Sequence, residues 1–298
     1  MFMNKQKKSV SIGITIYNEE HNIKRLLTSV LNQVENNFRL KEIIVISDGS
    51  TDNTIDNALK IRDRRIHLII HKERLGKSAR LNEIFSVFKG DLLFLIDADI
   101  LIKNRNLFFN IIKKWGPEKN QLISIKAEPL KARNFFEACI NYSNKIKEDI
   151  RYKWNDGNNF LAFRGCFMGL SRKFAKSIKL DNSLINNDTF IYFSAIRQSY
   201  KTKYFPTDLV YYKSPSKWDD HISQSTRFQN SEQELEEIFS SDLKKQYKIP
   251  FSIILRVSIK YFLLNPFYFL GYFILYIASK YKRIGEVTST WDISLTTK

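Results

Sequence analysis

The stretch LLFLIDADI, residues 92–100, is an apolar run that ends in two carboxylates, Asp97 and Asp99. Short continuous apolar runs of this kind are typical of strands that are buried on both faces of a parallel sheet. In such sheets, ligands bind beyond the carboxyl ends of the strands. The stretch therefore predicts a strand of a parallel sheet, with a polar site at its end.

Further apolar runs alternate with helical segments around this stretch. We expect strands over 9–17, 41–48, 66–71 and 91–97. We expect helices over 20–32 and 77–88, and one further helix that begins at about residue 50. This alternation predicts an α/β fold, with a mostly parallel central sheet flanked by helices. Polar residues at 17–19 and 48–50 also follow predicted strands, so we expect them to meet Asp97 at one edge of the sheet.

The middle of the chain is less periodic. Helical patterns cover 134–152, 187–199 and 218–239, and residues 160–170 form a strand-like run with glycine breaks. No repeat or low-complexity linker precedes residue 248. We therefore expect one catalytic domain over 1–240 and a separate tail over 241–298.

Residues 249–283 of this tail are mostly apolar and aromatic, and no charge occurs from 261 to 279. About 20 apolar residues are needed to span a bilayer, and cations flank the run on both sides. Asn265-Pro266 can break a helix inside it. We expect a membrane-associated segment, as a kinked, interfacial or re-entrant helical hairpin rather than a single span; the alternative is a buried core helix.

The net charge of the chain is +17, which predicts anionic partners: nucleic acid, an acidic membrane surface or phosphorylated substrates. Solubility alone is the simpler explanation of this charge. The two cysteines, Cys139 and Cys166, lack metal-ligand spacing and are expected to be reduced thiols of a cytosolic protein. The sequence MFMNKQKKSV at the amino terminus lacks the apolar stretch of a signal peptide, so we do not expect secretion by that route.

Two carboxylates at a strand end suit a particular kind of metal site. Mg²⁺ is typically held by one or two carboxylates and completes its shell with phosphate oxygens and water. Asp97 and Asp99 therefore fit a metal–diphosphate site better than an all-protein cage. Turns are also rich in Asp, so the pair alone leaves a simple turn as the alternative.

Four motifs that follow one another along the chain resemble the amino-terminal motifs of family 2 glycosyltransferases. They are TIYNEEHNIKRLLTSVLNQ (15–33), IIVISDGSTDNT (43–54), ERLGKSARLN (73–82) and LLFLIDADI (92–100). FRGCFMGLSRK (163–173), INNDTFI (185–191) and QSTRF (224–228) resemble, in order, the acceptor-side glycine segment, the general-base motif and the Gln-x-x-Arg-Trp motif of processive members. The resemblance implies a GT-A fold and transfer of a sugar from a nucleotide-sugar.

The resemblance also implies roles for single residues. Nucleotide-sugar binding falls to Thr15, Tyr17, Glu19, Asp48, Lys77, Asp97, Gln224, Arg227 and Phe228. Asp48 would accept a hydrogen bond from the base, which favours uracil. Asp99 would hold the metal, Mg²⁺ or Mn²⁺, together with Asp97, and the metal would assist departure of the nucleotide diphosphate.

The candidate catalytic base is Asp188, in Asn187-Asp188-Thr189, where the family commonly has Glu before the Asp. It would deprotonate the acceptor hydroxyl in an inverting transfer; a helix N-cap is the other explanation of an Asp at this place. Gln224 and Arg227 share one helix face. Phe228 replaces the family's Trp, which puts processive synthesis in doubt more than sugar transfer.

The leading hypothesis is thus a metal-dependent, inverting glycosyltransferase at the cytoplasmic face of the cell membrane. It would use a UDP-sugar and act on a saccharide or lipid-linked acceptor in the synthesis of surface polysaccharide. One alternative is transfer to a polyprenyl phosphate, which would be its own nucleophile. A second is a basic protein that binds nucleic acid or a membrane, but the cations are dispersed and no RNA-binding signature occurs, so nucleic acid is not an expected partner.

Overall fold

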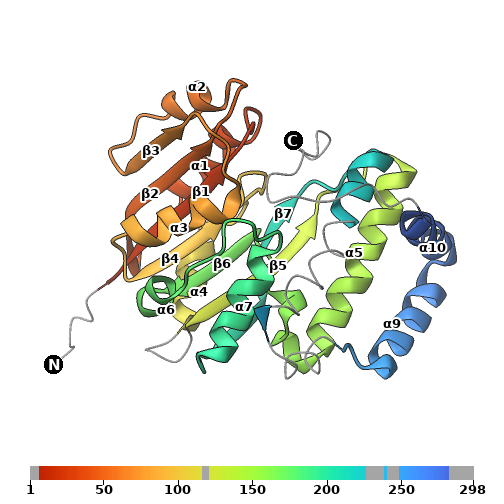
Figure 1. Ribbon diagram of the computed structural model, residues 1–298. Helices are drawn as coiled ribbons and strands as arrows, with labels where there is room; N and C mark the ends of the chain where they lie inside the picture. Colours follow the sequence, from red (N-terminus) through yellow and green to blue (C-terminus); the bar gives the residue numbers. More distant parts are fainter. Residues whose placement is uncertain (1–6, 116–120, 226–237, 240–247, 282–298) are drawn as a thin grey trace.

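A seven-stranded sheet forms the centre of the computed structural model, which describes residues 7–115, 121–225, 238–239 and 248–281 (Figure 1). The order of its strands is β3-β2-β1-β4-β6-β5-β7. They are β1 (Lys8–Ile16), β2 (Phe38–Asp48), β3 (Ile66–His71), β4 (Leu92–Ile96), β5 (Leu122–Pro129), β6 (Phe167–Ser171) and β7 (Thr202–Tyr212). Neighbouring strands pair parallel except at β6, which runs antiparallel to β4 and β5. The predicted mostly parallel sheet is confirmed.

Helices lie on both faces of this sheet (Figure 1). They are α1 (Ile23–Leu31), α2 (Thr54–Leu59), α3 (Lys77–Val87), α4 (Leu107–Trp115), α5 (Phe135–Lys153), α6 (Arg172–Ser177), α7 (Asn187–Arg197), α9 (Phe251–Leu264) and α10 (Pro266–Tyr281). Two short 3₁₀ turns, η1 (Asn155–Gly157) and η2 (Phe160–Ala162), follow α5. The predicted α/β class is confirmed.

Alternating side chains of the strands build two cores, one on each face of the sheet. On β4, Leu92, Phe94 and Ile96 belong to one apolar cluster, whereas Leu93 and Leu95 belong to the other. Successive side chains of a strand point to opposite faces. The first cluster includes buried residues of α1 and α4, and the second includes those of α3, α6 and α7. β4 is therefore buried on both sides, as its continuous apolar sequence predicts.

The strand order shows at which edge of the sheet a ligand site can form. β1 lies between β2 and β4, so the chain extends the sheet first on one side of β1 and then on the other. A crevice for a ligand forms where the order reverses, outside the carboxyl ends of the strands. The segments after Ile16 and Ile96, where β1 and β4 end, meet at this point.

Helices α9 and α10 pack against α5 at the end of the molecule opposite β3 (Figure 1). Buried Val257 of α9 meets Tyr142, Ile146 and Ile150 of α5, and Phe269 and Tyr272 of α10 pack around them. The expected break at Asn265-Pro266 is confirmed, because α9 ends at Leu264 and α10 begins at Pro266. In the part of the chain that the structure describes, no helix has the length and apolar character needed to cross a membrane.

The prediction of a strand over 160–170 is wrong in its first half. Residues 160–162 form η2, and the strand starts only at Phe167. The glycine break decides this, because the Gly165 N–H donates to the side chain of Asp188 rather than to a neighbouring strand. Helices α4 and α6 and strands β5 and β7 are additions to the sequence prediction, and the predicted helix over 218–239 lies partly outside the described residues.

Candidate active site

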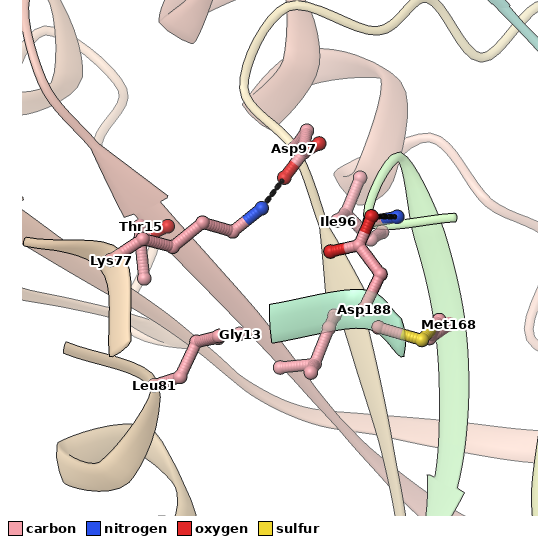
Figure 2. A pocket seen from close by; sticks show the side chains of 10 residues that line it. Gly13, Thr15, Lys77, Leu81, Ile96, Asp97, Met168 and Asp188 are labelled. Carbon is pink, nitrogen blue, oxygen red and sulfur yellow. Dashed lines mark hydrogen bonds and ion pairs between the residues drawn. The ribbon is translucent and has the colours of Figure 1, made fainter. Parts of the chain in front are cut away.

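Asp97 follows β4 directly and forms an ion pair with Lys77. The Lys77 Nζ lies 2.6 Å from Asp97 Oδ1, and Figure 2 shows the two side chains pointing toward one another. Burial works against the charge of Lys77, but the carboxylates of Asp97 and Asp188 outweigh it and raise the pKa of the ammonium above its usual value. Lys77 is therefore a fixed positive charge at the rim of the sheet.

The start of α3 brings Lys77 to this place. Gly76 precedes the helix with a φ of +89°, a conformation that residues with a Cβ rarely adopt. Asp48 at the end of β2 holds this turn: it accepts hydrogen bonds from the N–H groups of Leu75 and Gly76, both at 2.9 Å, and from Arg80 Nε at 2.7 Å. Asp48 is buried, so its carboxylate is engaged in positioning the loop before Lys77. Its role toward the base of a nucleotide stays a prediction.

Asp99 lies two residues beyond Asp97 in a crowded carboxylate environment. Burial, together with the charges of Asp97 and Glu19, raises the pKa of Asp99, and the charge of Lys77 opposes this shift. The carboxylates of Asp97, Asp99 and Asp188 thus all act on the charge of Lys77. Such a set of oxygen ligands, short of positive charge, fits a hard divalent cation. The described residues contain no group of three or more His, Cys, Asp or Glu side chains arranged as a metal site.

Asp188, the second residue of α7, lines the same pocket as Lys77 and Asp97. Its Oδ2 accepts a hydrogen bond of 2.6 Å from the N–H of Gly165, and burial raises the pKa of its carboxyl group above the usual value. The N-cap of α7 is Asn186, whose Oδ1 accepts from the Thr189 N–H at 3.2 Å. The capping explanation of Asp188 is therefore wrong. Asn187, where the family commonly has Glu, is buried and accepts a 2.5 Å hydrogen bond from Ser78, which ties α7 to α3.

Lys77, Asp97 and Asp188 line one small pocket, shown in Figure 2, whereas Asp48 and Asp99 are not among its lining residues. Its lining is Gly13, Thr15, Lys77, Leu81, Leu95, Ile96, Asp97, Gly165, Met168 and Asp188. The structure therefore brings together predicted site residues from β1, α3, the end of β4 and α7. Gly165 was missed as a site residue, because its contribution is a backbone N–H; the glycine in FRGC was the available signal.

Tyr17 and Glu19 lie just beyond β1. The guanidinium carbon of Arg74 lies 3.8 Å from the centroid of the Tyr17 ring, and Glu19 accepts a 2.9 Å hydrogen bond from Asn22. Arg74 was not predicted, although it stands inside the motif ERLGKSARLN. The structure therefore adds Arg74 to the predicted residues of the nucleotide pocket, as a flat cation stacked on an aromatic ring.

The last predicted motif is only partly described. Gln224 lies half-buried in a helical segment over 218–225, and it is not among the residues that line the pocket. Arg227 and Phe228 lie outside the described residues. The roles of all three toward the donor stay predictions.

The family model described as "Glycosyl transferase family 2" matches residues 11–177, more than half of the chain. The chain belongs to glycosyltransferase family 2. The match covers β1 to α6 and includes the whole carboxylate site except Asp188, which follows it in the chain. The resemblance inferred from the sequence motifs is thereby confirmed.

Curated members of family 2 are similar over different lengths of this chain. "Probable glycosyltransferase YdaM" of Bacillus subtilis is 26% identical over 247 residues, which are 77% of this chain and 56% of that protein. The "Undecaprenyl-phosphate 4-deoxy-4-formamido-L-arabinose transferase" of Proteus mirabilis is 31% identical over 94 residues, 30% of this chain and 29% of that protein. The chain thus spans about half or less of these relatives.

A solved structure supports the GT-A-like fold of this family 2 chain. A mannosyltransferase of Pyrobaculum calidifontis, in complex with GDP-Man and Mn²⁺, superposes with a TM-score of 0.60. The superposition covers 95% of this chain and 77% of the other, at 17% identity. At this level of identity the likeness concerns the fold.

Proposed function

We propose that this chain is an inverting glycosyltransferase that transfers a sugar from a nucleotide-sugar at the rim formed by β1 and β4. One observation carries the proposal: Lys77, Asp97 and Asp188, from three different elements, line one pocket at the carboxyl ends of these strands. Family membership supports the same reaction class.

The nucleotide half of the donor is assigned to the segments after β1 and β2. The Tyr17 ring and the Arg74 guanidinium stacked on it form a flat surface just beyond β1, and Thr15 lines the pocket itself. Asp48 fixes the turn that carries Lys77, whose ammonium is placed to approach an anionic diphosphate. We favour a UDP-sugar because a carboxylate at the place of Asp48 can accept from the uracil N3–H.

The charge of the donor diphosphate requires a counterion, and Asp97 and Asp99 are the residues that would hold a divalent cation. A bound Mg²⁺ or Mn²⁺ would stabilise the charge that develops on the departing diphosphate. Lys77 keeps the Asp97 carboxylate oriented and adds one positive charge of its own. The mannosyltransferase with GDP-Man and Mn²⁺ supports a divalent metal on this fold.

Asp188 is the acceptor-side base in this proposal. Its carboxylate is held by the Gly165 N–H on one oxygen, which leaves the other oxygen for an acceptor hydroxyl. Its raised pKa makes it a stronger base than an exposed Asp. The hydroxyl proton passes to Asp188 as the acceptor oxygen attacks the anomeric carbon, and the nucleotide diphosphate leaves from the opposite face of the sugar.

The experiment that tests this function is a hydrolysis panel. The purified chain is incubated with UDP-, GDP-, CMP- and dTDP-sugars and Mg²⁺ or Mn²⁺, and release of the nucleotide is measured. We expect release from a UDP-sugar that a chelator stops. Failure to release nucleotide from any donor, with or without acceptors, would contradict the proposal.

We further propose that helices α9 and α10 attach the enzyme to the cytoplasmic face of an anionic membrane, where a lipid-linked acceptor would be presented. Most of the exposed large apolar side chains of the described residues lie on these two helices. They include Phe251, Leu255, Ile259, Phe262, Leu263, Leu264, Phe267, Leu270, Phe273 and Ile274. Soluble proteins rarely expose so large an apolar patch unless it is an interaction site. The exposed Lys248 and Arg256 and the net charge of +17 favour anionic lipid over a second apolar protein.

Replacing Leu263 and Phe267 with Glu is expected to weaken binding to phosphatidylglycerol-containing vesicles by at least about tenfold. Both side chains are more than 70% exposed, and burial of each in lipid is worth about 1.5–3 kcal/mol. Cosedimentation with vesicles measures the effect. The matched control is Leu59→Glu, which changes an equally apolar exposed residue on α2, far from α9 and α10. Equal vesicle binding by the wild type, the Leu263/Phe267 double variant and Leu59→Glu would contradict the membrane proposal.

A further inference from the structure

Lys77 and Asp188 each have a buried polar neighbour in the chain to which sugar transfer, as described above, assigns no role. Ser78 follows Lys77 as the second residue of α3, and Asn187 precedes Asp188 as the first residue of α7. The Ser78 hydroxyl donates to Asn187 Oδ1 at 2.5 Å, and its oxygen lies 3.1 Å from the Leu184 carbonyl oxygen. One buried hydroxyl therefore joins the first turns of the two helices that carry Lys77 and Asp188.

This hydrogen bond connects α3 and α7 at a crowded point of the pocket. A Cβ atom at Gly165 would lie 2.7 Å from Asp188 Oδ1 and 3.0 Å from Lys77 Nζ, so both side chains lie against Gly165. Figure 2 shows Lys77 and Asp188 extending into the pocket from different elements. Because closely packed groups transmit small displacements, a shift of α7 relative to α3 would move Asp188 within the pocket.

Lys77 has anchors that do not depend on α7. Asp48 holds the turn before it through the N–H groups of that turn, and the Lys77 ammonium pairs with Asp97 at 2.6 Å. The backbone next to Asp188, by contrast, is joined to α3 through the hydroxyl of Ser78. Loss of this hydrogen bond is therefore expected to displace Asp188 rather than Lys77.

The side chain of Asn187 serves this connection and not the start of its own helix. Asn186 caps α7, because its Oδ1 accepts from the Thr189 N–H at 3.2 Å. Glu, which the family commonly has in place of Asn187, would add a buried negative charge beside Asp188, and a buried charge without a partner is costly. The neutral amide oxygen accepts the hydrogen bond from Ser78 without that charge.

We propose that Ser78 and Asn187 are positioning residues, which hold Asp188 at the place where it takes the proton of the acceptor hydroxyl. This inference rests on the proposed function, because it takes Asp188 as the base. Neither Ser78 nor Asn187 lines the pocket, so both act through the position of Asp188. The expected signature is a lower kcat with the acceptor and an unchanged KM for the donor.

Ser78→Ala is the variant that removes this hydrogen bond with the smallest change of shape. Its acceptor-dependent kcat is expected to fall about tenfold to a hundredfold, because a displacement of about 1 Å at a reacting group can cost that much. The matched control is Ser177→Ala: Ser177, the last residue of α6, has its hydroxyl oxygen 2.8 Å from Gln198 Oε1 at the other end of α7. The control should keep the wild-type kcat. Equal kcat values for the two variants would overturn the inference.

A double variant separates the position of Asp188 from the stability of the fold. Ser78→Ala alone leaves the amide oxygen of Asn187 buried without its donor, which is expected to lower the melting temperature. Addition of Asn187→Leu replaces both partners by apolar groups and is expected to restore most of the melting temperature, but not kcat. Recovery of kcat together with the melting temperature would show that the hydrogen bond serves the fold alone.

A measurement without turnover separates failure of this inference from failure of the proposed function. NMR of protein that contains ¹³C-labelled aspartate reports the carboxyl carbon of Asp188, whose signal is the one absent from Asp188→Asn. This signal is expected to shift in Ser78→Ala and to stay in place in Ser177→Ala. A shifted signal in a protein that hydrolyses no donor contradicts the proposed function alone. An unshifted signal in an active enzyme contradicts the inference alone.

Discussion

Asp99→Asn is expected to lower kcat/KM for sugar transfer by about a thousandfold, which corresponds to about 4 kcal/mol of transition-state stabilisation. The substitution keeps the shape of the side chain and removes its charge. Asp99 and Asp97 are the carboxylates that follow β4 at the rim of the sheet, and a cation held there would lose one of its two charged ligands. Initial rates over a range of donor concentrations measure the effect.

The same variant is expected to remain folded, and this separates a lost ligand from a damaged core. Asp99 faces the charges of Asp97 and Glu19, so a neutral side chain reduces repulsion in the folded protein. The urea midpoint of Asp99→Asn should therefore not fall below that of the wild type. Asp56→Asn, at an exposed position on α2, is the matched control and should retain activity.

Removal of the metal should reproduce the variant. We expect EDTA to reduce wild-type transfer to the level of Asp99→Asn, and added Mn²⁺ to restore it in the wild type only. Full transfer by Asp99→Asn in the presence of EDTA would show that Asp97 and Asp99 serve the fold of the turn rather than a metal.

The sheet around β4 was predictable because its pattern is local. A continuous apolar run that ends in Asp97 and Asp99 determines both the double burial of the strand and the position of the carboxylates. The break between α9 and α10 was equally predictable, because Pro266 prevents one continuous helix. In both cases a few adjacent residues are enough to predict the structural feature.

The elements that were missed depend on distant contacts. β7 contains Pro206 and Asp208, which the sequence pattern does not favour in a strand; Pro206 is tolerated because β7 is at the edge of the sheet. Asp208 is buried, and its carboxylate lies 2.7 Å from Lys114 Nζ of α4. The α4 run LFFNIIKKW is short, and a short apolar run does not distinguish helix from strand.

The site divides in the same way. Lys77, Asp97 and Asp188, which line one pocket, were predicted as site residues from sequence because each is a charged side chain inside a recognisable motif. The Gly165 N–H has no side-chain signature, because its hydrogen bond to Asp188 arises only when the two chain segments meet. Arg227 and Phe228 lie outside the described residues, so their assignment still rests on the motif alone.

Asp188→Asn is expected to reduce acceptor-dependent kcat by about a hundredfold or more, the usual contribution of a general base, with little change in the KM for the donor. The amide oxygen can still accept from the Gly165 N–H, so the local structure is retained while the proton acceptor is lost. Activity of the wild type should fall as the pH drops through the pKa of Asp188, which burial raises above its usual value. This acid limb should be absent from the residual activity of the variant.

The neighbouring cap provides the matched control for this prediction. Asn186→Ala removes the hydrogen bond to the Thr189 N–H and is expected to cost about 1 kcal/mol of stability, but it should leave kcat near the wild-type value. If both variants lose stability and donor affinity together, Asp188 acts through the fold. If Asp188→Asn keeps its turnover with a phosphate acceptor, an unprotonated phosphate oxygen attacks the sugar without a base. The acceptor would then be a phosphate monoester rather than a hydroxyl compound, and Asp188 would have no role as its base.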